Sequence, residues 1–153
     1  MLPLPQNGGC LCGDVRYALR EEPLTVYACH CTDCQTETGS ACVVSVVAEQ
    51  SAVDWTGVRP EPFGVELPDG RSKILRRCPR CMGPIGSVER PDGLVSIDGG
   101  TFDDTSWIEP AGHIWTRSAQ PWIRIPKEAV RHETRPTQEQ LVELVRVWRN
   151  RER

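Results

Sequence analysis

Several features are scarce or absent in this sequence, and each absence excludes a class of protein. No uninterrupted apolar run approaches the ~20 residues that a membrane-spanning helix needs. The first residues, MLPLP, are too short and too proline-rich for a secretion signal. The 18 basic residues do not outnumber the 21 acidic ones, and the net charge of -3 argues against general affinity for nucleic acid. We therefore expect a soluble, cytoplasmic protein that binds neither membranes nor nucleic acid.

A repeating unit is also absent, as is the alternation of strands and helices that surrounds a thioredoxin-like redox motif. The length of 153 residues is enough for one domain with a core of its own. We expect a single domain over residues 1–153, with a core at about 8–125 and a C-terminal helix at about 137–151. Whether the chain is a monomer or a homodimer stays open.

Cysteine, by contrast, is abundant: there are eight, and seven of them lie in three short groups. The groups are C-x-C at Cys10 and Cys12, C-x-C-x-x-C at Cys29, Cys31 and Cys34, and C-x-x-C at Cys78 and Cys81. In a reducing compartment these spacings indicate metal ligands rather than disulfides. Zinc is the metal that such groups most often hold.

The central group differs from the outer two, which together make a closed four-thiolate site of the structural kind. In an extended segment Cys29 and Cys31 point to the same face, and a turn after them would bring Cys34 back to the same point. Three protein ligands leave one position of a tetrahedral zinc open, as in catalytic zinc sites. The central group therefore predicts an open site.

Two residues near the central group bear on whether that position stays open. Cys42 stands in an apolar run, where a buried and inert thiol is the simpler expectation, but as a fourth ligand it would close the site. His30 lies between two ligands and faces away from them, so we expect it to make a structural hydrogen bond. If either residue closed the site, the protein would be a non-catalytic, zinc-stabilised interaction module with both metal sites structural.

The apolar pattern predicts a mainly β protein. Strands are expected at 14–19, 24–28 and 42–48, and Pro-Asp-Gly hairpin turns at 68–70 and 91–93. The segment 99–126 lacks periodicity, and its Trp and His residues would either line a pocket or cover the edge of the β core. The only helix that the pattern predicts starts at the capping box 137–140 and carries one apolar stripe.

The three cysteine groups and two later segments resemble the glutathione-dependent formaldehyde-activating enzyme family. The later segments are His113-Ile114-Trp115 and Ser118-Ala119-Gln120-Pro121-Trp122, and the match runs from about residue 8 to residue 125. The resemblance implies a mainly β, Mss4-like zinc-binding fold of several small antiparallel sheets with a C-terminal helix. One departure is Met82 directly after Cys81, where the family commonly has glycine; it leaves the exact turn there open but not the metal ligation.

The resemblance also implies two zinc ions per chain. The structural ion would be held by Cys10, Cys12, Cys78 and Cys81, and the catalytic ion by Cys29, Cys31 and Cys34. The family name implies condensation of formaldehyde with glutathione, which is classed as a carbon–sulfur lyase reaction. A thiol such as glutathione would bind at the open zinc position as a thiolate and add to formaldehyde or a similar small electrophile.

Other side chains near the motifs are candidates for binding substrate and moving protons. Arginine suits the carboxylates of glutathione best, and the candidates are Arg16, Arg76, Arg77 and Arg117. His113 is the candidate for proton transfer because it lies beside Trp115 in the segment that could line a pocket. We expect His132 to be exposed, and Asp103 and Asp104 to form a solvated turn.

Overall fold

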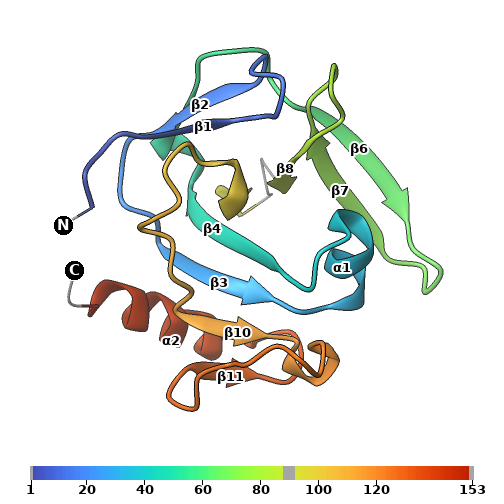
Figure 1. Ribbon diagram of the computed structural model, residues 1–153, viewed down its shortest axis with the longest axis vertical. Coiled ribbons are helices and arrows are strands. Elements are labelled where there is room, and N and C mark those ends of the chain that lie inside the picture. Colours follow the sequence, from blue (N-terminus) through green and yellow to red (C-terminus); the bar gives the residue numbers. More distant parts are fainter. Residues whose placement is uncertain (1, 88–91, 152–153) are drawn as a thin grey trace.

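The computed structural model describes residues 2–87 and 92–151 (Figure 1). Within them the chain is mainly β, as predicted, with two sheets and two α-helices. The smaller sheet is antiparallel, in the order β1-β2-β5, and consists of β1 Gln6–Gly9, β2 Arg16–Leu19 and β5 Val53–Trp55.

The larger sheet has eight strands in the order β11-β10-β3-β4-β9-β8-β7-β6. Its strands are β3 Thr25–Cys29, β4 Val43–Glu49, β6 Glu61–Glu66, β7 Ser72–Arg77, β8 Pro84–Ser87, β9 Leu94–Asp98, β10 Gly112–Ile114 and β11 Val130–His132. Short 3-10 turns lie at Gln50–Ala52, Gly99–Thr101 and Thr116–Ser118. The strands therefore form two sheets, in the mainly β architecture that the sequence predicted.

The core lies against β3, β4 and β9 at the centre of the larger sheet. β-Branched residues favour these strands, and Val26, Val46 and Ile97 are fully buried on them. Tyr17 of β2 packs edge-on against Phe102, with ring centroids 5.3 Å apart, and brings the smaller sheet onto the same core. Strand β3, which ends in Cys29, pairs with β4 on one side and with β10 on the other, so its position is fixed from both sides.

The sheet is mixed rather than wholly antiparallel, because β10 pairs parallel with both β3 and β11. Strands β10 and β11 are only three residues long, and β10 lies in the segment predicted to be irregular. The prediction that His132 is exposed is wrong for this reason: it lies on β11, buried, with its Nε2 3.9 Å from the Glu143 carboxylate.

The hairpin predicted at 68–70 is confirmed. It joins β6 to β7, and Gly70 at its tip has a φ of +83°, which favours glycine. The second predicted turn, at 91–93, lies partly outside the described residues, but the strands it joins, β8 and β9, pair antiparallel as expected.

Helix α1, Thr32–Thr38, was not predicted. It has no buried residue, so it carries no apolar stripe that a pattern search could find. It starts where the Cys31 sulfur caps its N-terminus and ends at Gly39, whose φ is 66°. The turn expected after Cys31 is therefore the first turn of a helix.

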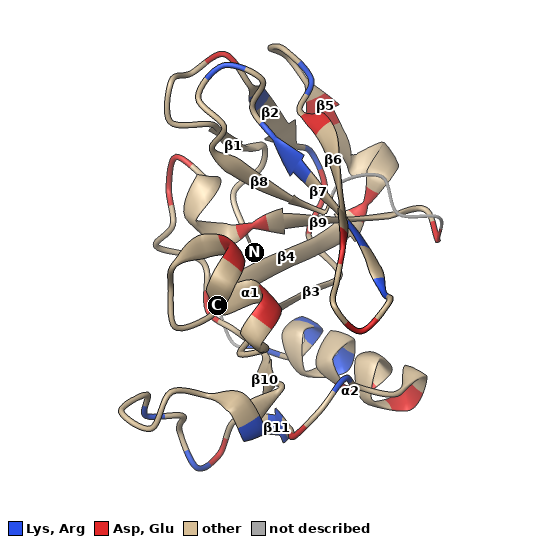
Figure 2. Cartoon of the chain, turned by 90° about the vertical axis from the view of Figure 1, so that its right-hand side faces the viewer, with Lys and Arg blue, Asp and Glu red and all other residues tan. Residues whose placement is uncertain are grey.

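Helix α2, Gln138–Arg149, confirms the predicted C-terminal helix and its capping box on Thr137. Leu144 and Trp148 on its apolar stripe are buried against the core. Acidic side chains lie toward its start and basic ones toward its end, which complements the helix dipole (Figure 2).

The tryptophans of the irregular segment divide between the two predicted roles. Trp107 packs edge-on against Phe102 and Trp148, so it covers the core. Trp115 lines a groove described below, whereas Trp122 is exposed. No helix among the described residues has the length and apolarity to cross a membrane.

Candidate metal centres and the adjoining cavities

The two outer cysteine groups form one cluster, although nearly seventy residues of chain separate them. Its four sulfurs, from Cys10, Cys12, Cys78 and Cys81, lie within 4.8 Å of one another. The Sγ–Sγ distance is 3.5 Å between Cys10 and Cys12 and 3.7 Å between Cys12 and Cys78. A tetrahedral zinc with Zn–S bonds of about 2.3 Å requires about 3.8 Å between sulfurs, so this cluster fits the ion.

Backbone N–H groups point at the sulfurs of this cluster. The Val15 N–H donates to the Cys10 sulfur at 3.3 Å, and the Arg80 N–H donates to the Cys78 sulfur at 3.4 Å. Burial raises the pKa of Cys10, but the Val15 N–H and the neighbouring thiols lower it further, to about 6. These donors stabilise the thiolate form that a metal needs.

The turn after Cys81 contains the residue in which this sequence departs from the usual pattern. Met82 has a φ of 57°, in the left-handed region where glycine is favoured. Its N–H donates to the Cys78 carbonyl at 3.0 Å, and its carbonyl accepts from Arg77 at 2.9 Å. The turn keeps the conformation that suits glycine, with a methionine in it, and the cysteines remain clustered.

The central cysteine group forms the second cluster, at the junction of β3 and α1. Cys29 ends the strand, Cys31 caps the helix and Cys34 lies in its first turn. The Cys29 and Cys34 sulfurs are 3.7 Å apart, again close to the spacing on a tetrahedral zinc. The Cys34 N–H donates to the Cys31 sulfur at 3.3 Å. Hydrogen bonds from the Cys29 and Cys34 thiols and from this N–H lower the pKa of Cys31.

Among the described residues, no fourth Cys, His, Asp or Glu joins this cluster. Cys42 lies in neither cluster, and burial raises the pKa of its thiol. His30 is fully buried, and its Nε2 is hydrogen-bonded to His113 Nδ1 at 3.0 Å. All eight cysteines are free of disulfides. Neither of the two residues that could have closed the site does so in this arrangement.

His113 contacts His30, the residue between Cys29 and Cys31 in the chain. Burial, with contributions from His30 and Arg131, lowers its pKa to about 4, so the ring is neutral at pH 7. Its ring stacks on His30, with centroids 5.3 Å apart. It is not among the residues that line the two cavities next to the cluster.

Three polar side chains fix the loop between Cys29 and Cys34; Ser118 and Gln120 belong to a motif noted in the sequence, whereas Gln35 was not predicted to take part. Gln35 Nε2 donates to the carbonyls of His30 and Ser118, both at 2.8 Å. The Ser118 hydroxyl also donates to the His30 carbonyl, at 2.9 Å, and Gln120 donates to the Gln35 side chain at 2.6 Å. The motif that contains Ser118 and Gln120 therefore holds the backbone between the ligands in place.

A cavity of about 140 Å³ lies against Cys29 and Cys34, and its lining mixes apolar residues such as Val43 with the charged side chains of Glu37, Lys73 and Asp98. Glu37 of α1 forms an ion pair across it with Lys73 of β7. Asp98 of β9 also faces it, and burial raises the pKa of this carboxyl to about 6, helped by the charge of Glu37. The three-cysteine cluster thus adjoins a small chamber, which is lined by the Lys73 ammonium and by the carboxyl groups of Glu37 and Asp98.

One glycine and one charged side chain shape this chamber. Gly86 in its wall has a φ of +129°, and a Cβ there would lie 2.2 Å from the Ser96 carbonyl, so a larger residue does not fit. Burial lowers the pKa of Lys73, but the hydrogen bond to Glu37 and the charge of the Cys34 sulfur outweigh this effect, and the net pKa lies above its ordinary value. The ammonium therefore stays charged beside the sulfurs.

A wider groove of about 500 Å³ reaches Cys31 and Cys34 from another side. Its walls include three cationic side chains, those of Lys73, Arg71 and Arg135. Arg71 forms ion pairs with Asp69 and Asp33, at 2.8 and 3.1 Å. The sequence reading named none of these three, because they belong to no cysteine motif.

The arginines that were named lie elsewhere. Arg16 forms an ion pair with Asp103, and Arg77 donates to the Met82 carbonyl. Arg76 lies on β7, and Arg117 stacks over Trp115 with its guanidinium carbon 4.9 Å from the ring. None of the four lines the chamber or the wider groove as described, although Trp115 does line the groove.

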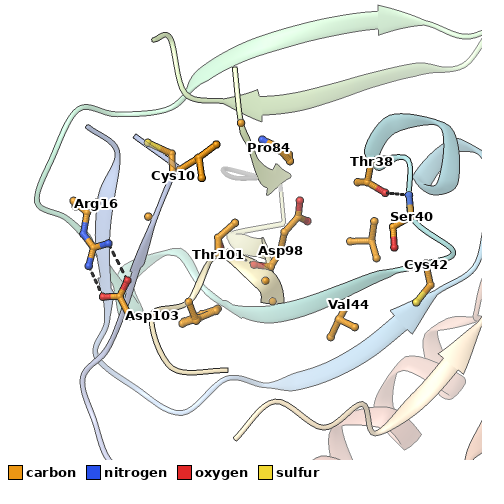
Figure 3. A pocket seen from close by; sticks show the side chains of 17 residues that line it. Cys10, Arg16, Thr38, Ser40, Cys42, Val44, Pro84, Asp98, Thr101 and Asp103 are labelled. Carbon is orange, nitrogen blue, oxygen red and sulfur yellow. Dashed lines mark hydrogen bonds and ion pairs between the residues drawn. The ribbon is translucent and has the colours of Figure 1, made fainter. Parts of the chain in front are cut away.

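The largest of these cavities, about 550 Å³, has no residue of the three-cysteine cluster in its lining, although it shares Val43 and Asp98 with the chamber (Figure 3). Figure 3 shows Arg16 paired with Asp103 at one end and Cys42 near Thr38 and Ser40 at the other. Asp103 and Asp104 are exposed, and Asp104 accepts from the Ser106 N–H at 2.9 Å, as expected of a solvated turn. This cavity touches Cys10 of the four-cysteine cluster but no sulfur of the other.

Comparison with known proteins agrees with this arrangement. The family model described as glutathione-dependent formaldehyde-activating enzyme matches residues 5–118, well over half of the chain. The chain belongs to this family. No curated protein matches the sequence. The mainly β architecture and the two cysteine clusters are consistent with the Mss4-like zinc fold that membership in the formaldehyde-activating family implies.

Proposed function

We propose that this member of the family is a zinc-dependent carbon–sulfur lyase that adds a thiol such as glutathione to formaldehyde or a similar small electrophile. The observation that carries the proposal is the incomplete three-cysteine cluster, which borders a chamber and a groove, whereas the other cluster has four sulfurs. Reduced thiols suit a cytoplasmic protein.

The same observation underlies the proposed ligands. Cys10, Cys12, Cys78 and Cys81 would hold a structural zinc, and Cys29, Cys31 and Cys34 a catalytic one. At the three-cysteine cluster the zinc ion would supply a positively charged, thiophilic centre, to which a substrate thiol can bind as its thiolate.

The side chains of the chamber would prepare that thiolate for reaction. The Lys73 ammonium adds positive charge beside Cys34, and Glu37 fixes its position through their ion pair. In the net reaction the thiol gives up its proton, the sulfur electron pair forms the new carbon–sulfur bond, and the carbonyl oxygen takes up one proton.

We assign the donation of the proton that the carbonyl oxygen takes up to Asp98 rather than to His113. Asp98 faces the chamber next to Cys29 and Cys34, and a carboxyl with a pKa of about 6 is partly protonated near neutral pH. The Nδ1 of His113 is engaged by His30, which lies between two of the cysteines. We propose that His113 positions the His30 segment.

The wider groove would receive the remainder of the thiol. Glutathione carries two carboxylates, and guanidinium groups bind carboxylates in pairs of hydrogen bonds. Arg71 and Arg135 lie in the groove that leads to Cys31 and Cys34, so they replace the four arginines that proximity in sequence suggested.

The experiment is a comparison of exchange rates. Magnetisation-transfer NMR measures how fast ¹³C-formaldehyde exchanges with its glutathione adduct, with and without a catalytic amount of protein. We expect the wild type to accelerate the exchange above its spontaneous rate, Cys34→Ser to lose the acceleration, and Cys42→Ser, which alters a thiol outside both clusters, to keep it. A wild type no faster than the spontaneous reaction would overturn the proposal.

A further inference from the structure

A fourth cavity, of about 540 Å³, lies between the β6–β7 hairpin and helix α1. Figure 1 shows the hairpin at the edge of the larger sheet, with α1 beside it. The hairpin contributes an apolar wall made of Phe63, Val65, Leu67 and Leu75. We call this cavity the apolar groove.

The groove-facing residues follow the alternation of a β-strand. Phe63 and Val65 lie two apart on β6, and Leu75 is the register partner of Phe63 on β7. Phe63 is 52% exposed although it lines the groove. Ile74, on the opposite face of the same hairpin, is 57% exposed and lines none of the four cavities described here.

The apolar groove adjoins the site of the proposed reaction. Glu37 and Lys73 line both the groove and the chamber against Cys29 and Cys34. Lys73 and Leu67 also line the wider groove that reaches Cys31. A group attached to the reacting carbon would pass the Glu37–Lys73 pair and then meet the apolar wall.

Formaldehyde has one carbon and no apolar group to bury, so it makes no use of this groove. We infer that the electrophile of this enzyme is an aldehyde with an alkyl or aryl group, which the apolar groove holds while its carbonyl carbon lies at the three-cysteine cluster. The inference rests on the proposed function. The chemistry is the same addition: a sulfur–carbon bond forms, the thiol proton is released, and the carbonyl oxygen gains a proton.

Stable mimics of the adduct test the inference. S-methyl, S-butyl and S-hexyl glutathione are thioethers that do not react, and isothermal titration calorimetry measures their affinities. Each buried methylene should tighten binding by about two- to fourfold, so S-hexyl glutathione should bind at least about tenfold more tightly than S-methyl glutathione.

Two matched variants locate the effect. Phe63→Ser should remove most of the dependence on chain length and leave the affinity for S-methyl glutathione unchanged. Ile74→Ser alters a similarly exposed residue on the other face of the hairpin and should keep the full dependence.

Three outcomes would overturn the inference. If the methyl and hexyl compounds bind equally, the thiol site stands and the groove is not part of it. If neither compound nor glutathione binds, the proposed function fails as well. If Phe63→Ser instead dissociates a dimer in sedimentation and leaves the chain-length dependence intact, the groove is a contact between two copies of the chain.

Discussion

The two cysteine clusters use the same ligand atoms but are built differently. The four-cysteine cluster joins the start of the chain to the segment after β7, so it ties together parts of the sequence that are far apart. The three-cysteine cluster lies within six residues, on the end of a strand and the first turn of a short helix. The four-cysteine cluster links distant segments of the fold, whereas the three-cysteine cluster lies on one local segment of it.

Their surroundings differ in the same sense. Backbone N–H groups face the sulfurs of Cys10 and Cys78. The three-cysteine cluster faces a chamber with Lys73, Glu37 and Asp98. Charged side chains that are half buried cost stability, and they are kept where chemistry needs them. The comparison teaches that surroundings, more than ligand type, separate a structural centre from a candidate catalytic one.

The largest expected effect comes from breaking the first cluster. Cys78→Ser removes a fully buried ligand that links distant segments, and we expect it to lower the free energy of unfolding by at least ~3 kcal/mol, because structural zinc binding is coupled to folding. Denaturant unfolding measures this loss. A variant as stable as the wild type would refute a structural role.

The matched change in the second cluster should have a different result. Cys34→Ser should reduce the zinc content from two ions per chain to one and keep a cooperative unfolding transition, because the cluster lies on an α1 without buried residues. Metal analysis and circular dichroism together check this. Loss of both ions, or of the fold, would show that the two centres are not independent.

The buried carboxyl of the chamber gives a pH-dependent effect. The pKa of Asp98 is raised from 3.8 to about 6, so the folded state binds this proton more tightly than the unfolded state does. The stabilisation is complete below about pH 4 and is lost as the pH rises through 6. Asp98→Asn should therefore be more stable than the wild type above pH 6, by roughly 2 kcal/mol, with the difference vanishing near pH 4.

Unfolding curves of both proteins between pH 4 and 8 measure that difference. Because the metal ligands titrate in both proteins alike, only the difference between them is informative. A constant difference over the whole range would mean that Asp98 keeps an ordinary pKa.

The smallest effect concerns backbone strain at the first cluster. Met82→Gly should raise the free energy of unfolding by about 0.5–1 kcal/mol, because glycine adopts the φ of 57° without the cost that a side chain adds. Met82→Ala is the control and should change stability little, since alanine bears the same cost. Thermal unfolding distinguishes them, and a destabilised glycine variant would contradict this account of the turn.

The sequence was most informative where spacing alone defines the chemistry. The three cysteine groups were found from their C-x-C and C-x-x-C spacings, and the two outer groups were joined because together they supply the four thiolates of a structural site. The capping box at Thr137 and the hairpin turn at 68–70 were found because each depends on local residue types. Each cysteine group, the capping box and the hairpin turn are encoded within a few residues.

The features that were missed depend on contacts between distant segments. Helix α1 is polar on all sides and is held by its ends, at Cys31 and Gly39. The parallel pairing of β10 with β3 joins residues about eighty-five positions apart, and it buries His132 by placing β11 beside β10. Lys73 reaches the second cluster only because β7 folds beside α1, although its position two residues before Leu75 on the same strand face was a usable signal.

The most direct test of the central claim is the visible spectrum of the cobalt-substituted protein, titrated with glutathione, because the spectrum reports how many sulfurs surround each ion. We expect two ions per chain, one with four sulfurs throughout and one whose three-sulfur environment becomes four-sulfur as glutathione is added. Two four-sulfur ions from the start, unaffected by glutathione, would contradict this claim and identify both centres as structural.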